Sequence, residues 1–291
     1  MDAQALQYVA AGLTAGSIYA LIALGFSIIF NASRIINFAQ GEFVMIGGMA
    51  AAALSAAGTP LLLAMAGGVA LAVVAGLLLE KLAIERARDA DVSTLIIITI
   101  GASILLRGLA QLAWGKGIHV LPPLSGGQPI AIGGATLLPQ SVWVMGTTLA
   151  IVALLSWFFG RTRLGRAMLA TSHNRLAAQL VGINVRLVLF ASFGLAALVG
   201  AIAGTLIAPI SFTSSEAGIM LGLKGFAAAI LGGLGSFHGA IAGGLLLGLL
   251  ETFGAGYVSS AYKDVIAFVV ILAVLFVRPD GLVGVLRSER V

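Results

Sequence analysis

Residues 187–215 read LVLFASFGLAALVGAIAGTLIAPISFTSS and contain no Asp, Glu, Lys or Arg. A transmembrane helix needs about 20 consecutive, mostly apolar residues to cross the hydrocarbon core of a bilayer. Residues 3–33 and 43–79 are also uncharged and also long enough to cross. These stretches predict a polytopic α-helical membrane protein rather than a β-barrel, whose strands alternate in polarity over segments of about 10 residues.

The composition of the whole chain supports this class. Hydrophobic residues make up 60% of the 291 residues and charged residues only 9%, whereas a soluble domain carries about 25% charged residues. The chain has no cysteine, which excludes disulfides, thiol catalysis and thiolate metal sites. The net charge of +5 comes from basic residues beside the apolar stretches, so we expect contact with membrane lipid and no nucleic-acid partner.

The apolar runs predict an all-α fold of about eight to nine transmembrane helices. The candidate spans cover residues 8–30, 36–57, 61–80, 93–112, 141–160, 187–208, 222–235, 239–257 and 264–278. The seventh and ninth are short, so we expect tilted, re-entrant or glycine-broken helices there. Residues 34–48 and 222–235 share small residues, a phenylalanine and a charge, which raises the hypothesis of inverted repeats.

No segment is long or polar enough for a separate soluble domain, so residues 1–291 are expected to form a single transmembrane domain. The longest connection, 113–140, is rich in Gly and Pro and is expected to be an ordered external loop. Glycine pairs spaced as GxxxG predict close helix packing, because small residues let two backbones approach in lipid. The pairs are Gly12/Gly16, Gly200/Gly204, Gly239/Gly243 and Gly244/Gly248.

The distribution of Lys and Arg predicts the orientation, because cytoplasmic loops of membrane proteins are enriched in these residues. With the N-terminus outside and the C-terminus in the cytoplasm, twelve of the 16 Lys and Arg fall on the cytoplasmic side. They are Arg34, Lys81, Arg86, Arg88, Arg161, Arg163, Arg166, Arg175, Arg186, Arg278, Arg287 and Arg290. Met1 and Asp2 open the chain without a basic region, so we expect the first apolar stretch to be a retained helix, not a cleaved signal.

Polar and charged residues inside the predicted spans or next to them are the candidates for a translocation pathway. An intramembrane charge costs about 2.5–3.5 kcal/mol at mid-membrane, so it is rarely present without a role. We therefore assign a pathway or gate to Arg34, Asn37, Gln40, Glu42 and Lys224. The alternative is structural: Arg34 and Lys224 snorkel to the interfaces, and neighbouring helices satisfy Glu42.

The basic segment 161–186 is the candidate contact for a soluble partner. A short helix is predicted over 175–181, with Ser172 or Asn174 as N-cap and Gly182 as left-handed C-cap. Leucines at i and i+4 and two adjacent alanines give this helix a small apolar face suited to docking. The candidate docking residues are Arg166, Leu176, Ala177, Ala178, Leu180 and Gly182. The alternative is an ordinary basic loop that anchors the topology.

No motif of the chain predicts catalysis, a metal site or a bound cofactor. Residues 124–128 spell LSGGQ, the signature of ABC ATPases, but the chain has no P-loop and prolines flank the pentapeptide. Residues 233–239 have the wrong spacing for a dinucleotide fingerprint. The three histidines lie far apart without a paired acid. We expect a non-catalytic protein that does not itself hydrolyse ATP.

Several stretches, in order along nearly the whole chain, together resemble the branched-chain amino-acid permeases of ABC importers, of the LivH type. They are residues 16–25, 34–42, 161–167, 182–184, 222–235 and 278–282. The resemblance implies a bacterial inner-membrane importer in which two permease subunits join two cytosolic ABC ATPases and a periplasmic solute-binding protein. It also places ATPase coupling at residues 176–182, which keep the Ala-Ala and Gly of the family's coupling loop but have Leu176 in place of its acid.

Two other functions stay open at this point. A homologous permease could carry urea, an amide or a sugar, and an ion-coupled secondary transporter could use Glu42 as its proton or ion site. The sequence does not identify the substrate, because a separate receptor sets much of the selectivity in binding-protein-dependent import. It also does not say whether the second permease subunit is a copy of this chain or a paralogue.

Overall fold

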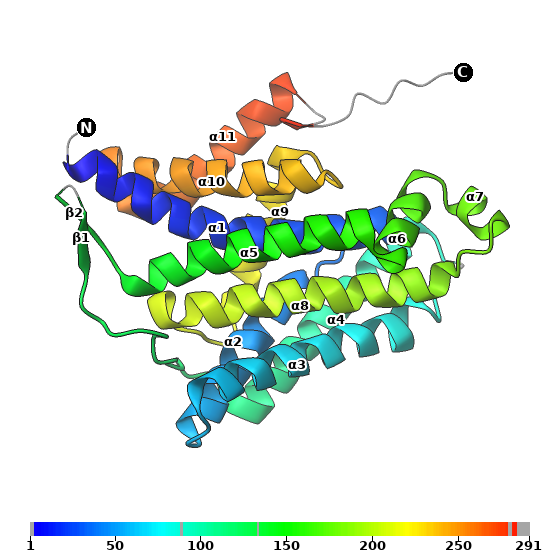
Figure 1. Ribbon diagram of the computed structural model, residues 1–291, viewed down its shortest axis with the longest axis horizontal. Helices are drawn as coiled ribbons and strands as arrows, with labels where there is room; N and C mark the ends of the chain where they lie inside the picture. Colours follow the sequence, from blue (N-terminus) through cyan, green and yellow to red (C-terminus); the bar gives the residue numbers. More distant parts are fainter. Residues whose placement is uncertain (1–2, 88–89, 133, 279–280, 284–291) are drawn as a thin grey trace.

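The computed structural model describes residues 3–87, 90–132, 134–278 and 281–283, and its helices run roughly side by side (Figure 1). Arg88, Arg287 and Arg290 of the orientation argument lie outside these residues. The helices are α1 (Ala3–Ser33), α2 (Gln40–Ala56), α3 (Leu61–Leu79), α4 (Val92–Trp114), α5 (Pro139–Arg161), α6 (Arg163–His173), α7 (Arg175–Leu180), α8 (Val185–Ser211), α9 (Ala217–Gly232), α10 (Phe237–Tyr257) and α11 (Lys263–Val277). A π-helical turn (Glu80–Ile84) extends α3, and a 3₁₀ turn (Ser260–Tyr262) precedes α11.

The structure confirms the polytopic all-α class. Six helices are long and apolar enough to cross a membrane by length and composition, and each predicted span coincides with a helix. Two predicted spans had wrong bounds, and one helix was not predicted. The second span begins at Gln40 rather than residue 36, the seventh covers Ala217–Gly232 rather than 222–235, and α6 was not predicted.

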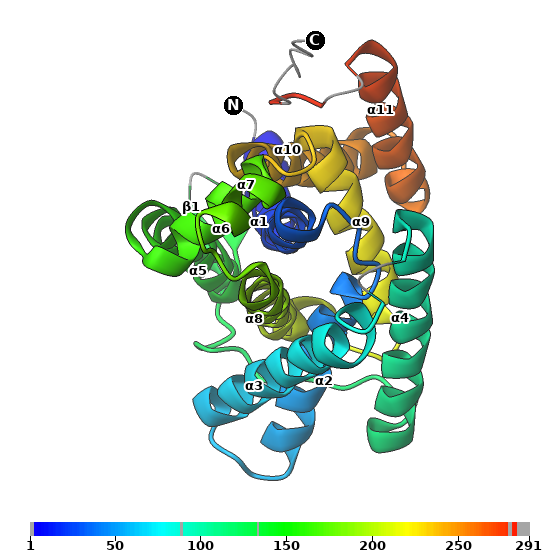
Figure 2. The same cartoon turned by 90° about the vertical axis from the view of Figure 1, so that its right-hand side faces the viewer.

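Helix α1 is the centre of the bundle. Figure 2 shows it enclosed by α5, α8, α9 and α10. Residues 20–24 of α1 have no exposed surface, and no polar face runs along its middle. A helix that is apolar on all sides is buried on all sides, so other elements are arranged around this one.

Two pairs of helices repeat the same pattern in opposite directions. The long α1 is followed by a short non-helical stretch and the short, buried α2, and the long α8 is followed likewise by α9. Arg34 (φ 62°) and Phe212 (φ 59°), each directly after the long helix, are the only non-glycine residues with positive φ in the described part of the chain. Because α1 and α8 run antiparallel (Figure 1), the arrangement agrees with the hypothesis of inverted repeats.

The two short helices cross near their first turns. A Cβ atom on Gly41 of α2 would lie 2.1 Å from the carbonyl oxygen of Gly218 in α9. Helix α2 begins beside the middle of α8, where Gln40 Nε2 donates to the carbonyl of Ala196 at 3.0 Å, and the middle of α9 packs against α1 through Gly225 and Ile22. Helices that start inside the bundle, rather than at its ends, leave polar backbone groups and polar side chains near the middle of the bundle.

The loop between α4 and α5 is ordered, as predicted. It contains a two-stranded antiparallel hairpin of β1 (Ile130–Ile132) and β2 (Ala135–Leu137). His119 and Thr213 exchange two backbone hydrogen bonds, 2.8 and 3.0 Å long, which tie the loop to the connection between α8 and α9.

All four predicted GxxxG pairs lie at close contacts between helices. Gly12 and Gly16 of α1 face the pair Gly244/Gly248 of α10, whereas Gly200/Gly204 pack against α2 and Gly239/Gly243 against α9. A Cβ atom on Gly248 would lie 2.3 Å from the backbone nitrogen of Gly16. The neighbour here is backbone and not a flexible side chain, so added atoms force the helices apart.

We therefore expect Gly248→Ala to destabilise the protein. Overpacking a tight contact costs about 1–3 kcal/mol, which should lower the thermal unfolding midpoint in detergent by several degrees. Gly101→Ala is the matched control, because Gly101 is also helical but has open space at its Cβ position. That variant should be neutral or up to about 1 kcal/mol more stable. Equal midpoints for the two variants would contradict the packing argument.

Candidate functional site

Glu42 lies in the first turn of α2 and is 1% exposed. Its Oε1 atom accepts hydrogen bonds from Ser103 Oγ at 2.7 Å and from Arg107 Nη2 at 2.8 Å. Its other oxygen, Oε2, and the Nε atom of Arg107 are buried without a hydrogen-bond partner. The carboxylate is therefore neutralised by an arginine but not fully hydrogen-bonded.

Arg107 is the residue of this candidate site that the sequence analysis did not single out. Ser103 and Arg107 are four residues apart on α4 and so share one face of that helix, and Arg107 Nη2 donates to Ser103 Oγ at 3.2 Å. The available signal was that Arg107 is the only charge in the predicted span 93–112. An intramembrane charge implies a partner elsewhere in the bundle.

A cavity of about 280 Å³ opens beside the Glu42–Arg107 pair. It lies where α1, α2, α4 and α9 meet, and most of its wall is apolar or aromatic. The lining residues are Phe26, Phe38, Glu42, Ile100, Ser103, Ile104, Arg107, Gly218, Ile219, Gly222, Leu223 and Phe226. One charged pair within an apolar wall is the usual composition of a site for a small molecule.

The other polar residues of the 34–42 cluster do not line this cavity. Asn37 is buried and its Oδ1 accepts from the backbone nitrogen of Ala39 at 3.1 Å. Gln40 fills the space left by two glycines, Gly25 of α1 and Gly200 of α8. Both residues hold the non-helical connection before α2 in place.

Arg34 lies apart from Glu42, at the end of α1. Its Nη2 donates to the backbone carbonyl of Ser172, and its guanidinium lies 5.8 Å from the centre of the Phe30 ring. The side chain thus joins the end of α1 to α6. Of the predicted pathway residues Arg34, Asn37, Gln40, Glu42 and Lys224, only Glu42 lines the cavity.

The alternative that the Lys224 side chain snorkels to the membrane interface is wrong. It lies in the middle of α9, is 7% exposed, and forms ion pairs with Glu251 Oε1 at 2.8 Å and Asp264 Oδ1 at 2.7 Å. Tyr19 of α1 donates to Glu251 Oε2 at 2.7 Å, and Lys263 Nζ lies 3.6 Å from Glu251 Oε1. This charge cluster links α1, α9, α10 and α11, and Lys224 does not line the cavity at Glu42.

The short helix of the basic segment is confirmed as α7. Asn174 Oδ1 accepts from the backbone nitrogen of Ala177 at 2.9 Å, which makes Asn174 the N-cap. At the other end Ile183 N donates to Ala178 O and Gly182 N to Gln179 O, both at 3.0 Å, with Gly182 at φ 86°. This is a Schellman C-cap, which requires the left-handed residue that glycine supplies.

The face that α7 presents differs from our prediction at one residue. Leu176 and Leu180 are 67% and 81% exposed, and Ala177 and Arg166 are also exposed. Ala178, however, is only 3% exposed because it packs inside the chain, so it cannot contact a partner. The exposed apolar surface at this end of the molecule is formed by the two leucines and Val181.

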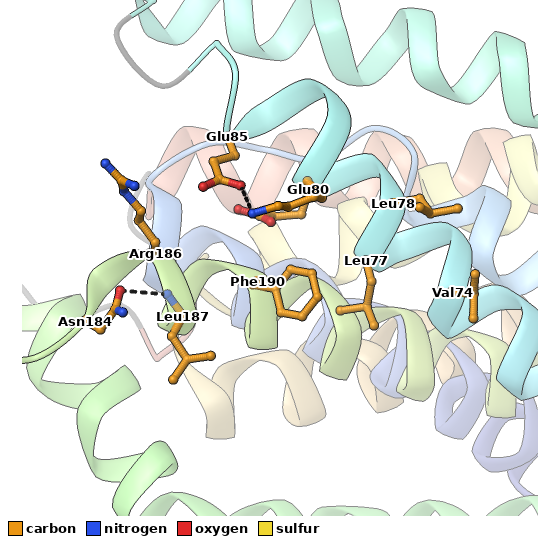
Figure 3. Close-up of a pocket in the computed structure, with 10 residues that line it drawn as sticks. Val74, Leu77, Leu78, Glu80, Glu85, Asn184, Arg186, Leu187 and Phe190 are labelled. Atoms are coloured by element: carbon orange, nitrogen blue, oxygen red, sulfur yellow. Dashed lines mark hydrogen bonds and ion pairs between the residues drawn. The ribbon is translucent and has the colours of Figure 1, made fainter.

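A cleft of about 600 Å³ lies between α3 with its π-helical turn and the start of α8 (Figure 3). Acidic and basic side chains lie at one end of the cleft and apolar ones along its walls. They are Val74, Leu77, Leu78, Glu80, Lys81, Glu85, Asn184, Arg186, Leu187 and Phe190. Lys81 Nζ and Glu85 Oε2 are 2.6 Å apart, so part of this charge is already paired.

The family model described as branched-chain amino acid transport system, permease component, matches residues 8–275. The chain belongs to this family. LivH of Escherichia coli (strain K12), a high-affinity branched-chain amino acid transport system permease protein, is 37% identical over 98% of this chain and 97% of its own length. BraD of Pseudomonas aeruginosa, of the same description, is 33% identical over 98% of each chain.

A less similar relative is named for a different substrate. The ribose import permease protein RbsC of Escherichia coli (strain K12) is 29% identical over 89% of this chain and 82% of its own length. Among solved structures, PsaBC from Streptococcus pneumoniae in complex with Fab matches with a TM-score of 0.47 and 19% identity, over 96% of this chain and 91% of that one.

In this branched-chain amino acid permease, the buried charge cluster should be required for stability. Lys224→Met leaves Glu251 and Asp264 without their shared cation, and removing one partner of a buried ion pair costs about 3–5 kcal/mol. Lys263→Met is the control, because the Lys263 side chain is 48% exposed and exposed pairs contribute about 0–1 kcal/mol. We expect a clearly lower thermal midpoint in detergent for Lys224→Met alone. A midpoint unchanged from wild type would show that the cluster does not hold α9, α10 and α11 together.

Proposed function

We propose that this chain is the non-catalytic, membrane-spanning subunit of an ABC importer that carries branched-chain amino acids into the cytoplasm across a bacterial inner membrane. The observation that carries the proposal is the 37% identity to LivH over nearly the full length of both chains. The ribose permease is less similar, at 29% identity over a shorter range. We place the N-terminus outside and the C-terminus in the cytoplasm, on the distribution of Lys and Arg.

The cavity at Glu42 is the pathway site in this proposal. It adjoins the crossing of α2 and α9, where two short helices begin inside the bundle. Transporters built from inverted repeats bind substrates near the membrane midplane, at such interrupted helices. Arg34, Asn37, Gln40 and Lys224 then act as supports of the helices around the pathway and not as its lining.

Segment 161–186 is the coupling contact in this proposal, within a single transmembrane domain. Leu176 and Leu180 form an exposed apolar surface. Gly182 is followed by the first turn of α8, where Arg186 and Leu187 line the cleft shown in Figure 3. A cytosolic ATPase subunit that grips this surface would move α8, and α8 contacts both α1 and α2. The remaining partners are a second permease subunit, which is a copy or a paralogue, and a periplasmic solute-binding protein.

Transport by the reconstituted complex tests the function. We expect leucine uptake into proteoliposomes to need ATP and the binding protein, to be inhibited by vanadate, and to be unaffected by ionophores. Uptake driven by an ion gradient without ATP would replace this proposal by a secondary transporter. ATP-driven uptake of a sugar, urea or an amide in place of leucine would retain the importer and change its substrate.

The coupling contact is tested by Leu180→Arg. Leu180 is 81% exposed, so the change should leave the fold intact, yet an unpaired charge in a docked apolar contact costs several kcal/mol. We expect loss of both the co-purifying ATPase and leucine uptake. Arg163→Ala, at another exposed position of the same segment, should keep both, because single exposed charges contribute little. Retention of the ATPase by Leu180→Arg would show that the partner docks elsewhere.

A further inference from the structure

We propose that the cavity beside Glu42 and Arg107 holds the zwitterionic head group of an α-amino acid in transit, with its ammonium on Glu42 and its carboxylate on Arg107. The inference rests on the proposed function and adds the chemistry by which the membrane subunit itself recognises its substrate.

The unused hydrogen-bonding atoms of the pair are the first observation. Glu42 Oε2 and Arg107 Nε are both buried and both lack a partner, although the two side chains are joined through Oε1 and Nη2. Oε2 needs a donor, and an ammonium group has three donors and no acceptor. Nε needs an acceptor, and guanidinium groups bind carboxylates in a planar, two-pronged geometry. An α-amino acid carries both missing groups on one carbon atom.

The charges of the pair indicate which class of ligand the cavity can hold. The Glu42–Arg107 pair is neutral, so a zwitterion enters and leaves without changing the net charge of the site. A single cation or anion would leave one unmatched charge in an apolar surrounding, which is costly. A sugar supplies hydroxyl groups but no charge for either atom. The pair thus favours an amino acid over both an ion and a neutral solute.

The wall of the cavity fits the rest of such a molecule. Phe26 and Phe38 each contact Phe226, with ring centres 5.5 and 5.7 Å apart, and Ile100 and Ile104 complete an apolar surface. A cavity of about 280 Å³ is smaller than the roughly 300–1,000 Å³ of sites for drug-sized ligands. It therefore suits a small solute with a short aliphatic side chain.

Glycines provide the space at the charged end. Gly218 and Gly222 of α9 line the cavity, and a Cβ atom on Gly218 would lie 3.0 Å from Glu42 Oε2. A side chain at this position would therefore cover the oxygen that has no partner. Glycine at this position keeps side-chain atoms off Oε2.

Binding of leucine to the complete transporter without its binding protein, in nanodiscs, tests the inference. Labelled leucine is competed with leucinamide, which lacks the carboxylate, and with 4-methylpentanoate, which lacks the ammonium. We expect each competitor to be at least roughly tenfold weaker than leucine on wild type. Glu42→Gln keeps an acceptor for Ser103 and Arg107 but removes the charge, so it should abolish the preference for leucine over 4-methylpentanoate. Arg107→Gln should abolish the preference over leucinamide.

A second pair of variants keeps the test independent of the buried charges. Ile104→Trp should fill the cavity from its exposed side and lower leucine affinity at least roughly tenfold. Ile97→Trp is the matched control, because Ile97 and Ile104 are 67% and 62% exposed on the same face of α4 and Ile97 does not line the cavity. Its affinity should equal that of wild type.

The outcomes separate the two proposals. Competitor ratios that stay the same in Glu42→Gln and Arg107→Gln, equal affinities in the two tryptophan variants, or no saturable leucine binding to wild type would overturn the inference, even if wild type imports leucine with ATP. Failure of wild type to import any branched-chain amino acid would instead overturn the proposed function.

Discussion

Direct backbone contact between helices is the constraint on which this structure depends. Gly41 of α2 meets Gly218 and Gly222 of α9, and Gly16 of α1 meets Gly248 of α10, at distances that leave no room for a Cβ atom. An apolar side chain gains little free energy when it moves from contact with lipid tails to contact with another helix. Close packing of small residues therefore provides much of the association between helices in a membrane. The crossing of α2 and α9, and hence the cavity beside it, exists because these positions are glycine.

Two groups of buried charges are then placed around α9 and differ in how they are satisfied. Glu251 uses both carboxylate oxygens, one toward Lys224 and one toward Tyr19, and this cluster fastens α9 to α1, α10 and α11. Glu42 uses only one oxygen, and the other is buried beside Gly218 without a hydrogen-bond partner. A fully engaged carboxylate holds helices together, whereas one with an unused oxygen can take a ligand.

Much of the fold follows from local pattern, and the site does not. The apolar runs, the GxxxG pairs and the caps of α7 at Asn174 and Gly182 are all read correctly, since each depends on neighbouring residues alone. The late start of α2 is missed because residues 36–39 are no less apolar than a helix. The partner of Glu42 is missed because Arg107, 65 residues further along the chain, reaches it only when α2 and α4 pack together. The burial of Ala178 is missed because a helix of six residues is too short to show which face turns inward.

The backbone pairing of His119 with Thr213 has a mechanical consequence. Two hydrogen bonds fix the α4–α5 loop to the stretch that leads into α9, and Gln140 Nε2 of α5 donates to Leu206 O of α8 at 3.0 Å nearby. The loop and the start of α9 therefore cannot shift separately unless these bonds break. Only the short backbone stretch from Thr213 to Gly218 separates the hydrogen-bonded loop from the rim of the cavity, so a displacement of the loop would also displace this rim. The α4–α5 loop is thus fixed by backbone hydrogen bonds to the connection that leads into the short helix α9.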